Sequence, residues 1–279
     1  MPQGAPWPGA LLRRAAEGLQ RVPRGAAAAA VAGGLVALSW LGWRRARRRA
    51  RTAFNLETPV DREGTACVKE HPLILDARYG RDRPRNAVPM WVADMDLPCP
   101  PALVEAVRRR AAHPIYGYTM QDAAVWEPLR WWLRARHAWD VAPDSLVFSP
   151  SVVTSAANCV RAFTARGDGV LCFTPLYGPL QHVVEPEGRV LVSHRLRDGA
   201  CGAAPDWGHL EAQLRGAPGG PRVRLVFWCS PHNPGGRVWR REEVDRLLDL
   251  CQAHGAVLVS DEIHADLTHP CWGAPHRPA

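Results

Sequence analysis

The sequence predicts an α/β fold in three layers, with a mostly parallel sheet that has helices on both of its faces. Short apolar runs alternate with segments of helical periodicity from Leu146 onward, a pattern typical of strands joined by helical crossovers. The runs are nearly continuous in apolar residues, as expected of strands buried on both faces. With 279 residues, 47% of them hydrophobic, the chain is long enough to bury a large core.

Three elements are predicted ahead of the alternating region. Residues 88–96 form an apolar run that ends in two acids, which indicates a short strand. A helix is expected over 102–112 because Pro100 and Pro101 precede it, and proline is tolerated in a first helical turn. A second helix is expected over 122–137, where tryptophan and leucine recur at helical spacing.

The alternating region itself supplies five strands and four helices. The strands are predicted at 146–148, 170–173, 190–192, 224–228 and 256–259. The helices are predicted at 152–164, 178–184, 207–214 and 240–254. Since each pair of successive strands is separated by a helix, the strands are expected to run parallel.

The first 53 residues differ from the rest of the chain in charge. They hold ten arginines and one acid, Glu17, so they carry +9 of the total net charge of +8, and the remainder carries −1. The basic balance therefore belongs to the leader, and the globular part gives no indication of nucleic-acid binding. We predict three parts: a leader at 1–53, an N-terminal arm at 54–100 and a large domain at 101–279.

The leader contains a run of nineteen residues without a charge, 25–43, followed by a cluster of arginines. About 20 apolar residues span a bilayer, so one interpretation is a single-pass membrane anchor. The arginines on its C-terminal side would then hold the following domain in the cytosol. The alternatives are a disordered or amphipathic leader, a targeting peptide, or an overextended reading frame.

The eight cysteines are scattered through the chain, without a CxxC pair or the spacing of a zinc site. Several of them lie inside apolar runs. They are typical of buried thiols in a reducing compartment, so the prediction is a cytoplasmic protein without a disulfide framework or a metal.

Polar or aromatic residues follow four of the predicted strands. Ser149, Pro150 and Ser151 precede a helix whose first N–H groups could hold a phosphate, although a capped helix alone needs no ligand. Tyr177 follows the next strand and could stack on a planar ring, although a single tyrosine there is more often simply packed.

Two further strand ends carry an amide and a carboxylate. Asn233 lies in a proline-flanked loop, where its amide could donate to a phenolate oxygen or merely form an Asn turn. Asp261 ends the last predicted strand, and a buried carboxylate needs a cationic partner such as a protonated pyridine nitrogen. Strand ends of a parallel sheet share one edge. Together these residues supply the contacts that pyridoxal phosphate needs.

Six segments also carry a resemblance to a known family. They are WVADMD at 91–96, YGY at 116–118, SPSV at 149–152, TPLY at 174–177, CSPHNPG at 229–235 and SDEIH at 260–264. They resemble fold-type I pyridoxal-phosphate enzymes of the class I/II aminotransferase superfamily. The forms ADMD at 93–96 and DEIH at 261–264 resemble more narrowly the MalY/PatB group of cystathionine, or cysteine-S-conjugate, β-lyases. The resemblance covers residues 54–279.

The resemblance implies a role for each residue of the site. The backbone of Val152 and Val153 would hold the phosphate, and Tyr118 would reach the phosphate of a neighbouring subunit in a homodimer. The ring-binding residues would be Tyr177, which stacks on the ring, Asn233, which bonds the phenolic oxygen, Asp261, which holds the ring nitrogen, and His264, which supports the pocket behind Asp261. Ala93, Asp94 and Met95 would lie beside the substrate carboxylate.

The resemblance also implies a Schiff-base lysine some tens of residues after Asp261. The sequence given ends at Ala279, and its only lysine, Lys69, lies in the arm, where we assign it no catalytic role. We therefore expect no catalytic residue within this chain, and we expect a truncated product whose sheet is incomplete at the C-terminus. Such a chain is expected to be inactive and marginally stable.

The activity that the resemblance implies is β-elimination. Cystathionine or another cysteine S-conjugate would be cleaved to a thiol, pyruvate and ammonia with pyridoxal phosphate as cofactor. Two alternatives stay open: an aminotransferase, which shares every visible contact, and a catalytically dead interaction module. The expected partners are a sulfur-containing amino acid and a second subunit, with membrane contact only through 25–43.

Overall fold

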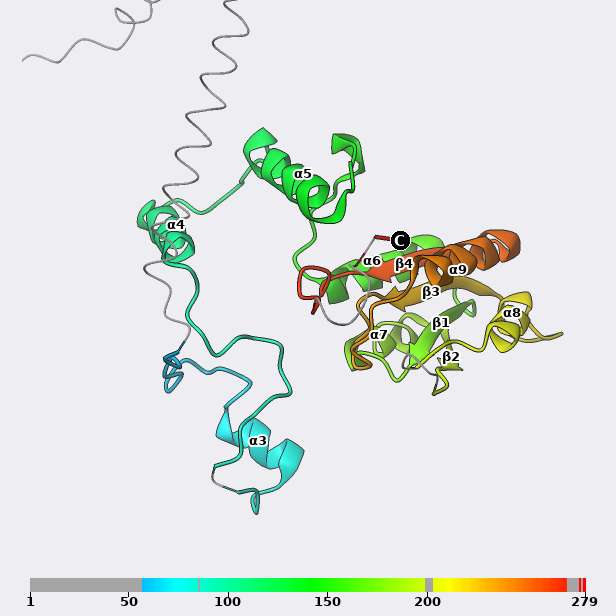
Figure 1. The fold of residues 1–279 in the computed structure, drawn as a ribbon, viewed down its shortest axis with the longest axis horizontal. Coiled ribbons are helices and arrows are strands. Elements are labelled where there is room, and N and C mark those ends of the chain that lie inside the picture. The colour runs from blue at the N-terminus through cyan, green and yellow to red at the C-terminus, as the bar shows by residue number, and fades with distance from the viewer. Residues whose placement is uncertain (1–56, 85, 199–202, 270–275, 277) are drawn as a thin grey trace, which may run out of the picture. The chain divides into compact units, whose positions relative to one another are not determined.

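The computed structural model describes residues 57–84, 86–198, 203–269, 276 and 278–279 (Figure 1). The chain divides into two compact units, Met1–Tyr118 and Thr119–Ala279. The predicted leader at 1–53, with its uncharged run at 25–43, lies outside the described residues. Of the helices in the described part, none combines the length and the apolar character needed to cross a membrane.

The first unit contains two described helices, α3 (Pro72–Tyr79) and α4 (Pro101–Ala112). Helix α4 confirms the prediction at 102–112 and begins on a proline, whereas α3 was not predicted. The predicted strand at 88–96 is wrong, because this segment has no strand beside it among the described residues. Its two acids are held instead by ion pairs with Arg62 and Lys69.

The second unit begins with helix α5 (Ala123–His137), which confirms the helix predicted at 122–137. Asp122 caps it by accepting a hydrogen bond from the N–H of Ala124 at 2.9 Å. A short 3-10 helix, η2 (Pro143–Ser145), follows. The strand predicted at 146–148 is wrong, because no described strand lies beside this segment and Phe148 is 62% exposed.

The sheet has four parallel strands: β1 (Gly169–Thr174), β2 (Val190–Arg195), β3 (Val223–Cys229) and β4 (Val257–Asp261). They confirm the other four predicted strands. Their order across the sheet is β2-β1-β3-β4 (Figure 1). The chain therefore adds β2 on one side of β1 and β3 on the other, and ligands of open α/β sheets bind where the order reverses in this way.

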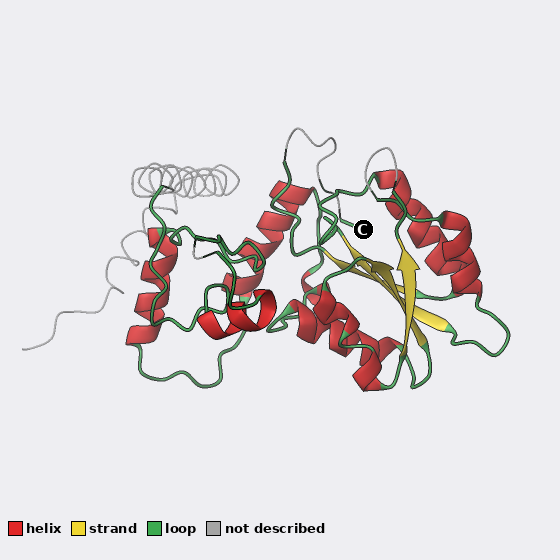
Figure 2. Ribbon diagram, turned by 90° about the horizontal axis from the view of Figure 1, so that it is seen from below, coloured by secondary structure: helices red, strands yellow, loops and turns green. Residues whose placement is uncertain are grey.

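Helices cover both faces of this sheet, which confirms the three-layer α/β fold (Figure 2). They are α6 (Val152–Phe163), α7 (Gly178–Gln181), α8 (Trp207–Arg215) and α9 (Arg241–His254). Successive strand residues alternate between the faces: Leu171 and Trp228 pack with α8 and α9, whereas Cys172 and Phe227 pack with α6 and α7. Helix α7 ends earlier than predicted because the chain turns into a 3-10 helix, η3 (Glu185–Glu187).

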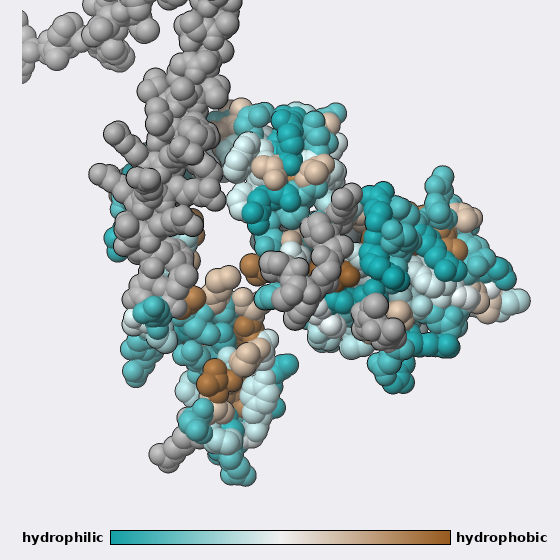
Figure 3. All heavy atoms as spheres, viewed as in Figure 1, coloured by the Kyte–Doolittle hydropathy of each residue, from teal (hydrophilic) through white to brown (hydrophobic). Residues whose placement is uncertain are grey.

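Helix α9 shows how these helices separate core from solvent. Val244 and Leu247 belong to the core on one face of the sheet. On its outer surface Arg241 and Asp245 form an ion pair with a nitrogen to oxygen distance of 2.8 Å. The side of the sheet-containing unit seen in Figure 3 is accordingly mostly hydrophilic.

A histidine on β2 is completely buried in this core. The ring of His194 packs edge-on against Phe173, with 5.3 Å between ring centroids, and its Nδ1 lies 2.7 Å from the side-chain oxygen of Gln213. Burial lowers the pKa of His194, although the hydrogen bond to Gln213 acts in the opposite direction. The imidazole is therefore neutral in the folded protein at neutral pH.

We expect the chain to lose stability as the pH falls below about 6.5, the pKa of an unfolded histidine. The unfolded state takes up the proton first, because the pKa of His194 is lowered in the fold. The contribution of neutral His194 to the stability of the fold is therefore complete above the unfolded-state pKa. It is lost as the pH falls from that value toward the folded-state pKa. Thermal unfolding followed by circular dichroism across this range measures the effect. His194→Gln should flatten the curve, and an equally steep curve would contradict the assignment.

Candidate cofactor site

The N-terminus of α6 presents backbone N–H groups without partners in the helix. Ser151 caps the helix, and its Oγ accepts a hydrogen bond from the N–H of Thr154 at 3.1 Å. Val152 and Val153 are the first two helical residues, whose N–H groups have no acceptor within an α-helix. The positive end of the helix dipole adds to them, so this end suits an anion such as phosphate.

Asp261 lies in the same cavity as this helix end. It is the last residue of β4, at the carboxyl edge of the sheet. The cavity has a volume of about 240 Å³, and its wall includes Val152, Ser155, Phe227 and Asp261. The structure thus brings together the predicted anion-binding end and the predicted acid.

The carboxylate of Asp261 is partly buried and lies near a second acid, Glu262. Burial raises its pKa, and the neighbouring Glu262 acts in the same direction, although a hydrogen bond from the N–H of Ile263 at 3.2 Å and the nearby His264 oppose them. Among the described residues no arginine or lysine forms an ion pair with it. A partly buried carboxylate in this state suits a cationic ligand group.

Glu262, the next residue, differs because it is fully partnered. It accepts hydrogen bonds from the Oγ of Ser260 at 2.8 Å and the N–H of Ala279 at 2.9 Å, and it lies 3.2 Å from the Nε2 of His276. Burial acts to raise its pKa, but these partners outweigh it and the pKa lies below its usual value. Sequence reasoning missed Glu262 and Ser155, since neither ends a strand.

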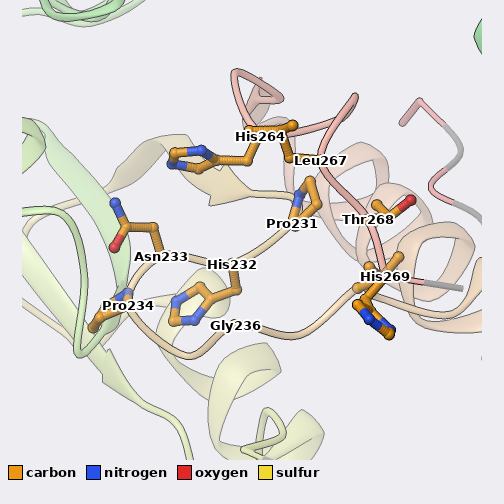
Figure 4. Close-up of a pocket in the computed structure, with 10 residues that line it drawn as sticks. Pro231, His232, Asn233, Pro234, Gly236, His264, Leu267, Thr268 and His269 are labelled. Atoms are coloured by element: carbon orange, nitrogen blue, oxygen red, sulfur yellow. The ribbon is translucent and has the colours of Figure 1, made fainter. Parts of the chain in front are cut away.

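Asn233 and His264 line a second cavity of about 260 Å³, together with His232 and Gly236 (Figure 4). The loop that carries Asn233 starts beside Asp261, because the N–H of Ser230 donates to the carbonyl of Asp261 at 2.9 Å. The side-chain amide of Asn233 makes no hydrogen bond to the described residues. It is therefore available to a ligand.

Tyr177 lies on the carboxyl side of the sheet, three residues after the end of β1. It is 39% exposed and lines neither of the two cavities. Tyr118 belongs to the other unit, of which it is the last residue, and its side chain is fully exposed. The predicted stacking role of Tyr177 and the predicted phosphate contact of Tyr118 therefore stay predictions.

Ala93, Asp94 and Met95 form an exposed loop in the first unit. Arg62 binds the carboxylate of Asp94 and donates to the carbonyl of Met95. Lys69 also holds the loop, because its Nζ donates to the carbonyl oxygen of Asp94 at 3.0 Å. Burial acts to raise the pKa of Asp94, but the hydrogen bonds from Arg62 and Cys67 and the charges of Arg62 and Lys69 together outweigh it, so the pKa is lowered. Sequence reasoning missed Arg62, because its partners lie more than thirty residues away.

Fold and strand-end residues together define a class of protein, an open α/β domain with a candidate ligand site at the carboxyl edge of its sheet. The chain belongs to the aminotransferase class I and II family, whose model matches residues 88–275. It is 44% identical over 195 residues to cystathionine beta-lyase PatB of Bacillus subtilis. This alignment covers 69% of this chain and 48% of that protein. It is 31% identical over 227 residues to protein MalY of Escherichia coli, covering 81% and 55%.

Solved structures agree with these relatives. Cystalysin from Treponema denticola, which contains a pyridoxal 5′-phosphate cofactor, matches with a TM-score of 0.71 and 29% identity over 81% of this chain and 55% of that one. The PLP-bound C-S lyase from Staphylococcus hominis has the same TM-score and coverage at 26% identity. The chain spans about half the length of the curated relatives it matches.

Proposed function

We propose that this chain is the cofactor-binding part of a carbon–sulfur β-lyase that uses pyridoxal phosphate. The observation that carries the proposal is the cavity shared by Asp261 and the N-terminus of α6, whose wall holds both a partly buried carboxylate and the first residue of a helix. The donor set fits a ligand that is cationic at one end and anionic at the other. The relatives PatB and the staphylococcal C-S lyase support the reaction class.

When bound, the cofactor supplies an electron sink, provided that its pyridine nitrogen stays protonated. Asp261 would hold that proton at the ring nitrogen. The amide of Asn233 would donate to the phenolic oxygen, and the N–H groups of Val152 and Val153 would bind the phosphate. Tyr177 would cover one face of the ring and exclude water from it.

The remaining assignments concern the substrate and the second subunit. His264 would support the pocket behind Asp261, and Ala93, Asp94 and Met95 would lie by the substrate carboxylate. Tyr118 would reach the phosphate of a neighbouring subunit in a homodimer. We assign the N-terminal arm to 54–100 and the partial large domain to 101–279. We also place the protein in a reducing, cytoplasmic compartment, and the six free cysteines of the described residues support this placement.

Binding of pyridoxamine 5′-phosphate tests the cofactor part of the proposal. This ligand has the phosphate, phenolic oxygen and ring nitrogen but needs no lysine to hold it. Equilibrium dialysis against the full chain should give saturable binding with one site per chain. Pyridoxamine, which differs only in lacking the phosphate, is the matched control and should bind far more weakly. Equal binding of both compounds, or of neither, would overturn the proposal.

We expect no covalent attachment of pyridoxal phosphate to Lys69, the only lysine of the sequence. This side chain is buried, and its Nζ lies 2.8 Å from Asp96 and 3.0 Å from the carbonyl of Asp94. An ammonium group held in this way is a poor nucleophile, since attack needs the free amine. Borohydride treatment followed by peptide mass spectrometry checks this. A pyridoxyl group on the peptide that contains Lys69 would contradict the expectation.

The products distinguish the lyase from an aminotransferase. β-Elimination consumes cystathionine and one water and yields homocysteine, pyruvate and ammonia. Amino-group transfer leaves the carbon–sulfur bond intact. Methylamine can be added as an external base in place of a lysine. Release of a thiol from cystathionine under these conditions would support the lyase activity. Loss of the amino group without thiol would overturn it in favour of transfer.

A further inference from the structure

His232 closes the loop that carries Asn233. It directly precedes Asn233 and is 3% exposed. Its backbone N–H donates to the carbonyl of Arg237 at 2.8 Å, and its own carbonyl accepts from the N–H of Gly236 at 2.7 Å. In addition its ring Nδ1 accepts from the N–H of Gly235 at 3.2 Å. Backbone and side chain of one residue therefore hold both ends of the turn around Asn233.

The His232 ring is in turn anchored to the sheet. It packs edge-on against Trp239, with 5.7 Å between ring centroids. The indole N–H of Trp239 donates to the carbonyl of Cys229, the last residue of β3, at 2.7 Å. A chain of contacts thus runs from the end of β3 through Trp239 and His232 to the turn.

Gly235 fits this ring and would tolerate no side chain. A Cβ at this position would lie 2.5 Å from the Nδ1 of His232, closer than such atoms approach. The ring and the turn are therefore matched in shape as well as joined by a hydrogen bond. Any side chain at 235 would displace the ring or the backbone.

We propose that His232 is a positioning residue, which fixes the amide of Asn233 for the cofactor through the bond from Gly235 to its Nδ1. The proposal rests on the role of Asn233 in the proposed function. Since Nδ1 accepts a hydrogen bond, Nε2 carries the hydrogen of the neutral ring, and it has no partner among the described residues. The acceptor at Nδ1 is thus the functional atom of this side chain.

Two amide variants separate the two ring nitrogens. The side-chain oxygen of asparagine can occupy the position of Nδ1, whereas that of glutamine reaches toward the position of Nε2. We expect His232→Gln to weaken the binding of pyridoxamine 5′-phosphate about tenfold, the ratio that corresponds to one hydrogen bond. His232→Asn should restore most of this affinity. Hydrogen exchange of residues 232–237 should accelerate in His232→Gln and stay slow in His232→Asn.

Gly235→Ala tests the same contact from the other side and should match His232→Gln in both measurements. Asn233→Ala is the control for direct contact: it should weaken binding while the exchange of the loop stays unchanged. Wild-type affinity in His232→Gln, or equal losses in the glutamine and asparagine variants, would overturn the proposal. If the wild-type chain fails to bind the ligand, the proposed function is wrong, whereas the exchange rates still decide whether His232 fixes the loop.

Discussion

Asp261→Asn is expected to weaken the binding of pyridoxamine 5′-phosphate by about 10- to 100-fold, because a hydrogen bond to a charged group contributes about 1.5–3 kcal/mol. Asparagine keeps the size of the side chain and can still accept the hydrogen bond from Ile263. It removes only the negative charge that would hold the protonated ring nitrogen. Equilibrium dialysis of both proteins measures the ratio, and an unchanged affinity would remove Asp261 from the site.

The same substitution is expected to stabilise the chain without ligand. Burial raises the pKa of Asp261, so its charged form is disfavoured in the fold. A carboxyl group whose pKa is raised in the fold stabilises the folded state while it is protonated. This stabilisation is complete below the unfolded-state pKa of 3.8 and is lost as the pH rises through the folded-state pKa. At neutral pH the charge of Asp261 therefore destabilises the folded chain. The urea midpoint of Asp261→Asn should lie above that of the wild type.

Glu262→Gln is the matched control for this experiment. Its pKa is lowered by partners that outweigh burial, so its charge stabilises the fold at neutral pH. The control should therefore unfold at lower urea than the wild type, opposite to Asp261→Asn. Shifts of the same sign in both variants would mean that the two adjacent carboxylates do not differ as described.

The central sheet could be predicted because its strands are specified by local pattern. Strands β1 and β3 are nearly continuous apolar runs, and helix α8 between them begins at the capping residue Asp206 and ends at Gly216. The segment 146–148 has the same composition, yet it forms no strand in the described structure. A strand exists only where another strand accepts its hydrogen bonds, and three residues do not specify that neighbour.

The site could be predicted only in part, for a related reason. The rule that parallel strands end at one edge placed Asp261 near the start of α6, and Asp261 and Val152 line one cavity in the structure. Partners that come from distant segments left no local signal. Arg62 beside Asp94 and His276 beside Glu262 depend on how loops return to the same place. His232 was visible within the motif, but its function depends on the ring geometry of the folded loop.

The other large effect is expected at Glu243, which belongs to a buried ion pair beside the Asn233 loop. Its Oε2 lies 2.7 Å from Nη2 of Arg237, and the two side chains are only 7% and 10% exposed. The same oxygen accepts from the N–H of Arg240 at 2.9 Å, at the start of α9. Glu243→Ala leaves the guanidinium of Arg237 buried without a counter-charge. We expect it to lower the free energy of unfolding by about 3–5 kcal/mol.

Urea denaturation followed by tryptophan fluorescence measures this loss, and Glu242→Ala supplies the control. Glu242 lies in the same first turn of α9 but is exposed, so its removal should change the free energy by less than about 0.5 kcal/mol. Similar losses in both variants would attribute the effect to the helix dipole and not to the ion pair. Arg237→Met combined with Glu243→Met should recover part of the stability, since no unpaired charge is then left buried. A double variant as unstable as the sum of its single variants would show that the two side chains act independently.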